Sequence, residues 1–141
     1  MQPESCSTGY VAPPILPADN LLRRMRESDV YADGRVKKAA FKPRKNGLDR
    51  DGLSVSVEDP QYRQQHRATF ELPGKLTATI QVKAVYEIGL DVRPDPDPSD
   101  PRHALITGIP DLTLGEKEQL EAERFAELLA RHASQYTFPE N

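Results

Sequence analysis

One segment of the chain alternates between apolar and polar side chains with the period of a β-strand. In residues 75–85, KLTATIQVKAV, every second residue from Leu76 to Ala84 is apolar, and the residues between them are Thr, Gln or Lys. Because successive side chains of a strand point to opposite faces of a sheet, this pattern predicts a strand with one buried face. Such a face needs a second layer to cover it.

A helix near the C-terminus can supply that second layer. Residues 113–134 carry an apolar stripe at helical spacing, and most of the glutamates lie off the stripe. Thr113 and Glu116 have the spacing of a capping box, which predicts where the helix begins. The stripe consists of Leu114, Leu120, Phe125, Leu128, Leu129 and His132.

Shorter patterns predict the remaining elements. Residues 53–57, LSVSV, alternate as a half-buried strand, and residues 103–109, HALITGI, have the composition of a strand buried on both faces. Residues 37–42, KKAAFK, predict a short strand. A short helix is expected over residues 20–28, with its arginines facing outward, and another over residues 58–70, which opens with acids and a proline.

Together these patterns predict a single small α+β domain over residues 18–141. We expect a mixed or mainly antiparallel sheet of four to five strands, packed by the long C-terminal helix. Residues 1–17 are proline-rich with few core-forming side chains, and we expect them to form an extended N-terminal tail. The residues expected to share one core are Leu76, Ile80, Val82 and Phe125.

The net charge of -3 conceals a strongly positive segment. Residues 23–45 hold nine Lys or Arg and three acids, a balance of +6, so the rest of the chain sums to -9. Residues 35–45 hold six cations and no acid, and we call this segment the basic arm. Its cations are Arg35, Lys37, Lys38, Lys42, Arg44 and Lys45. A turn at Asp33–Gly34 precedes the arm, and two turn signals predict an exposed loop over residues 44–52.

Three interpretations of the basic arm remain open. It can dock an acidic protein partner, bind phosphates of nucleic acid, or form a solvated edge that resists edge-to-edge pairing. Only Phe41 is interleaved for base stacking, and the sequence pI is about 5.6, whereas dedicated nucleic-acid-binding domains are usually basic. We therefore expect a non-catalytic partner-binding or regulatory protein that docks an acidic protein partner through the basic arm and the adjacent loop, and keep nucleic acid as an alternative.

Signals of catalysis are sparse. His103 follows the stiff segment PDPDPSDP at the start of a strand, where Asp97 or Asp100 could orient its ring. Arg44 and Ser54 are the other candidates for a small enzyme with a pocket near His103. The histidines are isolated from one another, the aspartates do not follow a calcium-loop pattern, and no phosphate-binding loop is present. We therefore expect neither a metal nor a cofactor.

Several pieces of the sequence resemble, in order and spacing, a group of small uncharacterised bacterial proteins. These pieces are DGRV, AAFKPR, GLSVS, GLDVRPDPDP and HALITGIPD. The resemblance implies a bacterial or mobile-element setting and carries no known activity. A second likeness is to compact ADP-ribosyltransferase-like domains, in which Arg24, Ser54 and His103 would line a cleft for NAD. The chain departs from that pattern because it lacks the glutamate motif.

The remaining features concern the compartment. The single cysteine, Cys6, cannot form an internal disulfide, so no oxidising compartment is implied. No run approaches the roughly 20 apolar residues of a membrane helix, and the N-terminus lacks the pattern of a signal peptide. We expect a cytoplasmic protein without a membrane partner. The sequence does not indicate an oligomeric state.

Overall fold

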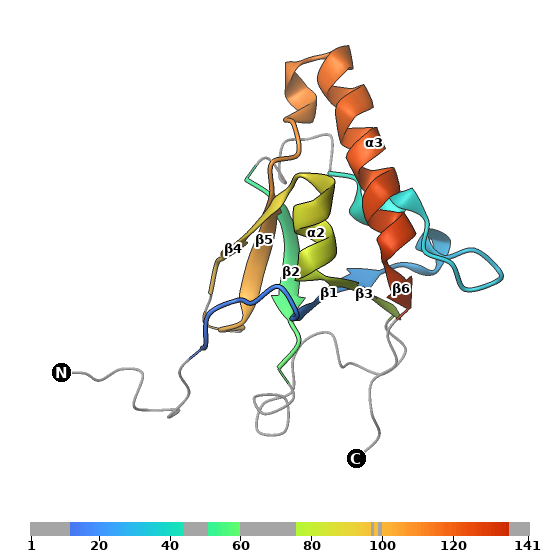
Figure 1. Ribbon diagram of the computed structural model, residues 1–141. Helices are drawn as coiled ribbons and strands as arrows, with labels where there is room; N and C mark the ends of the chain where they lie inside the picture. Colours follow the sequence, from blue (N-terminus) through green and yellow to red (C-terminus); the bar gives the residue numbers. More distant parts are fainter. Residues whose placement is uncertain (1–11, 44–50, 60–75, 97, 99, 136–141) are drawn as a thin grey trace.

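The chain folds into an α+β domain with a six-stranded antiparallel sheet (Figure 1). The computed structural model describes residues 12–43, 51–59, 76–96, 98 and 100–135. The strand order is β4-β5-β2-β1-β3-β6, and the long C-terminal helix α3 packs on the sheet. The predicted fold class is confirmed, with one or two more strands than expected. In the described part of the chain, no helix is long and apolar enough to cross a bilayer.

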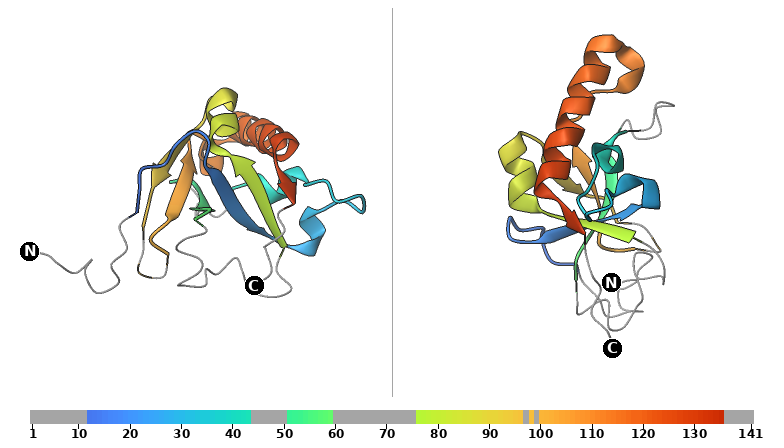
Figure 2. Two further views of the ribbon diagram at one scale, coloured as in Figure 1. Left: turned by 60° about the horizontal axis from the view of Figure 1, so that its bottom comes forward. Right: turned by 90° about the vertical axis from the view of Figure 1, so that its right-hand side faces the viewer.

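The described part of the chain contains six strands, two α-helices and three 3-10 helices. The strands are β1 (Asn20–Met25), β2 (Leu53–Val57), β3 (Leu76–Gln81), β4 (Asp91–Pro94), β5 (His103–Thr107) and β6 (Ser134–Gln135). The α-helices are α2 (Val82–Ile88) and α3 (Glu116–His132), and the 3-10 helices are η2 (Glu27–Asp29), η3 (Lys38–Phe41) and η5 (Leu112–Leu114). Figure 2 shows α2 and α3 on the same face of the sheet.

The predicted helix over residues 20–28 is wrong, because this segment forms the central strand β1. Leu21 faces Val57 of β2 and Ile80 of β3, and Leu22 faces Ser56 and Thr79. Adjacent leucines point to opposite faces of the sheet, yet both are buried. Pairing with two neighbouring strands therefore overrides a local pattern that also fits a helix face.

Two predicted strands are also corrected. The strand expected over residues 75–85 ends at Gln81, and α2 runs from Val82 to Ile88 and is followed by Gly89, which has a φ of 102°. Val82 and Val85 are both fully buried, and their spacing of three suits a helix face. Residues 37–42 form the 3-10 helix η3 and its flanks instead of a strand.

The core lies between the sheet and the helices. Ile80 and Val82 belong to it as predicted, while Leu76 and Phe125 are only partly buried and pack against it. Helix α3 buries a narrower stripe than expected, made of Ala122, Ala126 and Leu129. Small side chains allow the helix to approach the sheet closely.

Two predicted features of α3 are wrong. Leu114 and Leu120 of the predicted stripe are 71 % and 67 % exposed. The expected capping box does not form, because Thr113 lies in η5 and donates hydrogen bonds to Asp111, while Gly115 precedes α3. The helix predicted over residues 58–70 lies almost entirely outside the described residues.

The described part of the predicted tail contacts the domain. Ile15 is partly buried against the core, and the backbone N–H of Lys83 donates to the carbonyl of Pro17 at 2.9 Å. Asp19 accepts a hydrogen bond from the backbone N–H of Leu16. Residues 12–17 therefore lie along the domain in an extended path that leads into β1.

Two leucines of α3 provide a matched test of this packing. Leu129→Ala should lower the free energy of unfolding by about 2–5 kcal/mol, because the side chain is fully buried and its removal leaves a cavity. Leu120→Ala should change it by less than about 0.5 kcal/mol, because that side chain is mostly in solvent. Urea denaturation of both variants measures the difference. Equal effects would show that α3 packs through a different face.

Candidate functional site

The basic arm and the end of α3 enclose a hollow of about 480 Å³. We call it the basic hollow. Its lining residues are Tyr31, Arg35, Val36, Lys38, Glu127, Ala130, Arg131 and Ala133. The fold thus brings two cations of the arm, Arg35 and Lys38, beside a cation that lies far away in the sequence, Arg131. Three cations and one acid give the hollow a positive balance.

A tight turn shapes the first wall of the basic hollow. Val30 and Val36 form an antiparallel bridge, and the N–H of Tyr31 donates to the carbonyl of Arg35 at 2.8 Å. The N–H of Gly34 donates to the carbonyl of Tyr31 at 2.9 Å. Gly34 has a φ of 93°, a conformation that favours glycine. The turn predicted at Asp33–Gly34 is therefore present, and it places Tyr31 against the arm.

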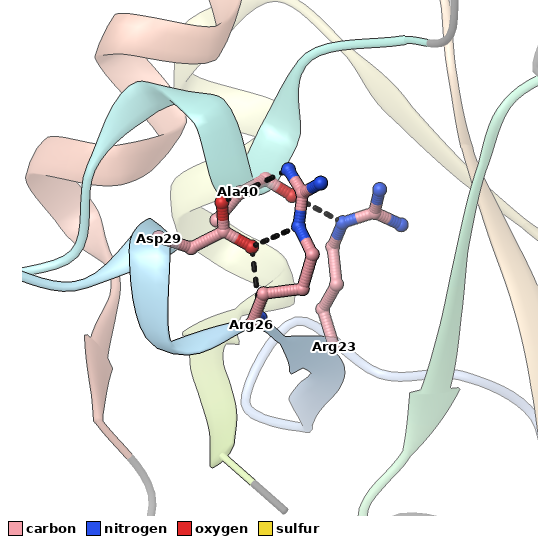
Figure 3. Close-up of polar contacts among 4 residues, drawn as sticks. All are labelled: Arg23, Arg26, Asp29 and Ala40. Atoms are coloured by element: carbon pink, nitrogen blue, oxygen red, sulfur yellow. Dashed lines mark hydrogen bonds and ion pairs between the residues drawn. The ribbon is translucent and has the colours of Figure 1, made fainter.

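A buried carboxylate holds the near end of the arm (Figure 3). Asp29 is 4 % exposed and accepts a hydrogen bond from the backbone N–H of Arg26 at 2.9 Å. The guanidinium of Arg26 also contacts this carboxylate, with an Nη2–Oδ1 distance of 3.3 Å. The backbone carbonyl of Asp29 in turn accepts from the N–H of Lys37 at 2.8 Å. Asp29 therefore ties the start of the arm to the end of β1.

An arginine of β1 holds the middle of the arm. The Nε–H of Arg23 donates to the carbonyl of Ala40 in η3, as Figure 3 shows, and its Nη1 donates to the carbonyl of Ser54 in β2 at 2.7 Å. One side chain thus links β1, β2 and η3. The sequence placed Arg23 among outward-facing cations of a helix, and this assignment is wrong.

The described cations of the arm differ in their partners. Arg35 pairs with Asp33, with an Nε–Oδ2 distance of 2.8 Å, and its guanidinium lies 4.7 Å from the centre of the Tyr31 ring. Lys37 lies 5.2 Å from the same ring centre. Lys38 forms an ion pair with Glu123 of α3. Cation–π contacts of this kind hold the Tyr31 ring beside the arm.

These ion pairs shift the pKa values of the groups that form them. The hydrogen bond from Lys38, together with its charge and that of Lys42, lowers the pKa of the Glu123 carboxyl. The same hydrogen bond raises the pKa of the Lys38 amine. A backbone hydrogen bond from Arg35 is the largest cause of the lowered pKa of Asp33. All of these groups remain charged at neutral pH.

Arg131 is the residue of the basic hollow that sequence reasoning missed. Its side chain is exposed, and among the described residues it has no ion-pair partner. Tyr31 was missed as well, although it stands two residues before the predicted turn. Of the other predicted arm cations, Lys42 is exposed, while Arg44, Lys45 and the loop over 44–50 lie outside the described residues.

The candidate catalytic residues lie elsewhere on the sheet. Ser54 of β2 pairs with Leu105 of β5, and His103 pairs with Ser56, so Ser54 and His103 lie on one face of adjacent strands. Neither lines the basic hollow. Arg24 lies on β1 with an exposed side chain.

The aspartate that contacts His103 is a different one from those expected. The Nδ1 atom of His103 lies 2.9 Å from the backbone carbonyl oxygen of Asp95 and 3.2 Å from its carboxylate. The Asp100 carboxylate accepts from the backbone N–H of Arg102 instead, and Asp97 lies outside the described residues. The aspartate shown beside the ring is therefore Asp95, which directly follows β4, whereas Asp97 or Asp100 was expected.

The part of the chain that the structure describes contains no group of three or more His, Cys, Asp or Glu side chains that could hold a metal ion. The chain matches no protein-family model, no curated protein and no solved structure. The chemistry of the site must therefore be argued from its own residues.

The Lys38–Glu123 contact predicts a measurable titration. The pKa of Glu123 should lie below its ordinary value of 4.5, and in Lys38→Met it should move back toward that value. Because the folded-state pKa is lowered, the stabilising effect of this pair is present above pH 4.5 and is lost as the pH falls through the folded pKa. NMR titration of the side-chain carboxyl measures both values. An unchanged pKa in the variant would show that the pair does not persist in solution.

The two adjacent arginines of β1 test the link to the arm. Arg23→Lys keeps the charge but cannot donate to both carbonyls in the same fork geometry, so it should lower the free energy of unfolding by about 1–3 kcal/mol. Arg24→Lys, at an exposed position, should change it by less than about 0.5 kcal/mol. Thermal and urea denaturation compare the variants. Similar small effects would show that the Arg23 contacts contribute little.

Proposed function

We propose that this protein is a non-catalytic binding or regulatory protein that docks an acidic segment of a partner protein at the basic hollow. The observation that carries the proposal is the convergence of Arg35, Lys38 and Arg131 around one concave surface. The bacterial or mobile-element setting implied by the sequence resemblance is part of this proposal. A binding protein needs only such a contiguous surface, without the aligned reactive groups of an enzyme.

The charges of the hollow suit a carboxylate-bearing partner. Arg131 offers a guanidinium that forms no ion pair within the described part of the chain, and a guanidinium can bind a carboxylate through two parallel hydrogen bonds. The Arg35–Asp33 and Lys38–Glu123 pairs are solvent-exposed, so exchanging an internal carboxylate for that of a partner costs little. Each cation is therefore accessible to an incoming acidic side chain.

The other lining residues favour a protein over a nucleic acid. Val36, Ala130 and Ala133 provide an apolar floor, and the half-exposed Tyr31 is of the type enriched at protein interfaces. Arg35 and Lys37 already cover the ring of Tyr31. A stacking platform for bases is thus occupied by the chain's own cations.

A pair of charge reversals tests the proposal. Arg131→Glu places an acid in the hollow, whereas Arg93→Glu makes the same change in net charge at an exposed position of β4, at the other end of the sheet. Pull-down from the native host with mass spectrometry should recover an acidic protein with the wild-type chain and with Arg93→Glu. Arg131→Glu should lose it, or retain it at least about tenfold less.

Salt and nuclease treatment separate the alternatives. Binding should weaken as the salt concentration rises above about 0.15 M, where the Debye length is roughly 8 Å. If nuclease abolishes the capture, the arm binds nucleic acid and the proposal fails. Equal losses in both variants would show that only net charge matters, and unchanged capture in both would exclude the hollow as the docking site.

A further inference from the structure

A second hollow, of about 290 Å³, lies between the N-terminal segment and the ends of β2, β4 and β5. We call it the proline hollow. Its apolar lining consists of Ala12, Pro13, Pro14, Ile15, Val57, Pro94, Pro96 and Pro101, and its two polar lining residues are Arg102 and His103. Proline rings lose little conformational freedom on binding a ligand, so these walls are largely preformed.

Each of the two polar residues has one side-chain nitrogen with no contact to the described residues. Arg102 is 6 % exposed, its Nη1 donates to the carbonyl of Pro13 at 2.6 Å, and its Nε lies 3.5 Å from the carboxylate of Asp59. Neither contact uses Nη2. The Nδ1 atom of His103 faces the carbonyl oxygen of Asp95, which can only accept, so Nδ1 carries the hydrogen. Nε2 is the ring nitrogen left for a ligand, and in the neutral ring it is an acceptor.

The charges around the hollow favour an uncharged ligand. The guanidinium of Arg102 already has an ion-pair contact with Asp59, and the Asp100 carboxylate accepts a hydrogen bond from the backbone N–H of Arg102 at 3.0 Å. Asp95 adds a third carboxylate next to His103. An ionic ligand would lose its hydration shell in this largely apolar space, whereas a neutral group avoids that cost.

We propose that the proline hollow binds a small uncharged molecule with an apolar body and a carboxamide group. The amide oxygen would accept from Nη2 of Arg102, and the amide N–H would donate to Nε2 of His103. The chain already shows the first half of this recognition, because Nη1 of the same arginine holds the amide carbonyl of Pro13. This site is independent of the basic hollow and of the function proposed for it.

The test compares two probes of the same shape. The full chain, labelled with nitrogen-15, is titrated with cyclohexanecarboxamide and, separately, with cyclohexanecarboxylate at neutral pH. The carboxamide should give saturable shifts of the backbone signals of Ile15, Arg102 and His103, with affinity in the millimolar range expected for a probe of about nine non-hydrogen atoms. The carboxylate should bind roughly tenfold more weakly or not at all.

Variants locate the contact. His103→Phe keeps a ring but removes the acceptor, and it should weaken carboxamide binding several-fold, while His132→Phe at an exposed position of α3 should leave it unchanged. If His103→Phe does not fold, the comparison of the two probes on the wild-type chain still decides. The proposal is overturned if no saturable shift occurs at these residues, if the carboxylate binds as tightly as the carboxamide, or if a folded His103→Phe binds the carboxamide normally.

Discussion

The contacts of Arg23 connect the sheet to the surface that carries the proposed function. Strand β1 pairs with β2 at Leu21 and Leu22. At the next residue, Arg23, the guanidinium rather than the backbone donates to the carbonyl of Ser54. The same guanidinium holds Ala40 in η3. Because η3 packs against α3, this side chain also helps to position the arm beside the helix. The basic hollow lies between these two walls.

The charge asymmetry of the sequence is partly an internal feature of the fold. The positive arm packs beside α3, whose glutamates supply the partner of Lys38 and one acid of the hollow. Some arm cations are thus already engaged, and the net positive charge seen by a partner is smaller than the sequence suggests. Arg131 matters for this reason, because it adds a cation from the helix that otherwise contributes acids to this surface.

Sequence patterns predicted those elements whose order of apolar and polar residues fits only one type of secondary structure. Residues 53–57 alternate between apolar and polar side chains, and residues 103–107 are almost continuously apolar. Both segments are too short for a helix, and both are strands. Leu21 and Leu22 were ambiguous, because only the pairing of β1 with two strands shows that both faces are covered. The arm was found from charge alone, but its hollow was not, because Tyr31 and Arg131 are brought together by the packing of α3, which no local pattern encodes.

The N-terminal segment gives the proline hollow a property that the basic hollow lacks. Residues 12–15 form one of its walls, and the contact between Arg102 and the carbonyl of Pro13 anchors them there. Detachment of this segment would remove the wall and expose the buried guanidinium, whose Nε atom has an ion-pair contact with Asp59 but no hydrogen bond to the described residues. Any molecule that binds the complete hollow must therefore also stabilise the docked segment, since binding to one state of an equilibrium shifts the population toward that state. Segment docking and occupation of the proline hollow are thus thermodynamically coupled through Arg102.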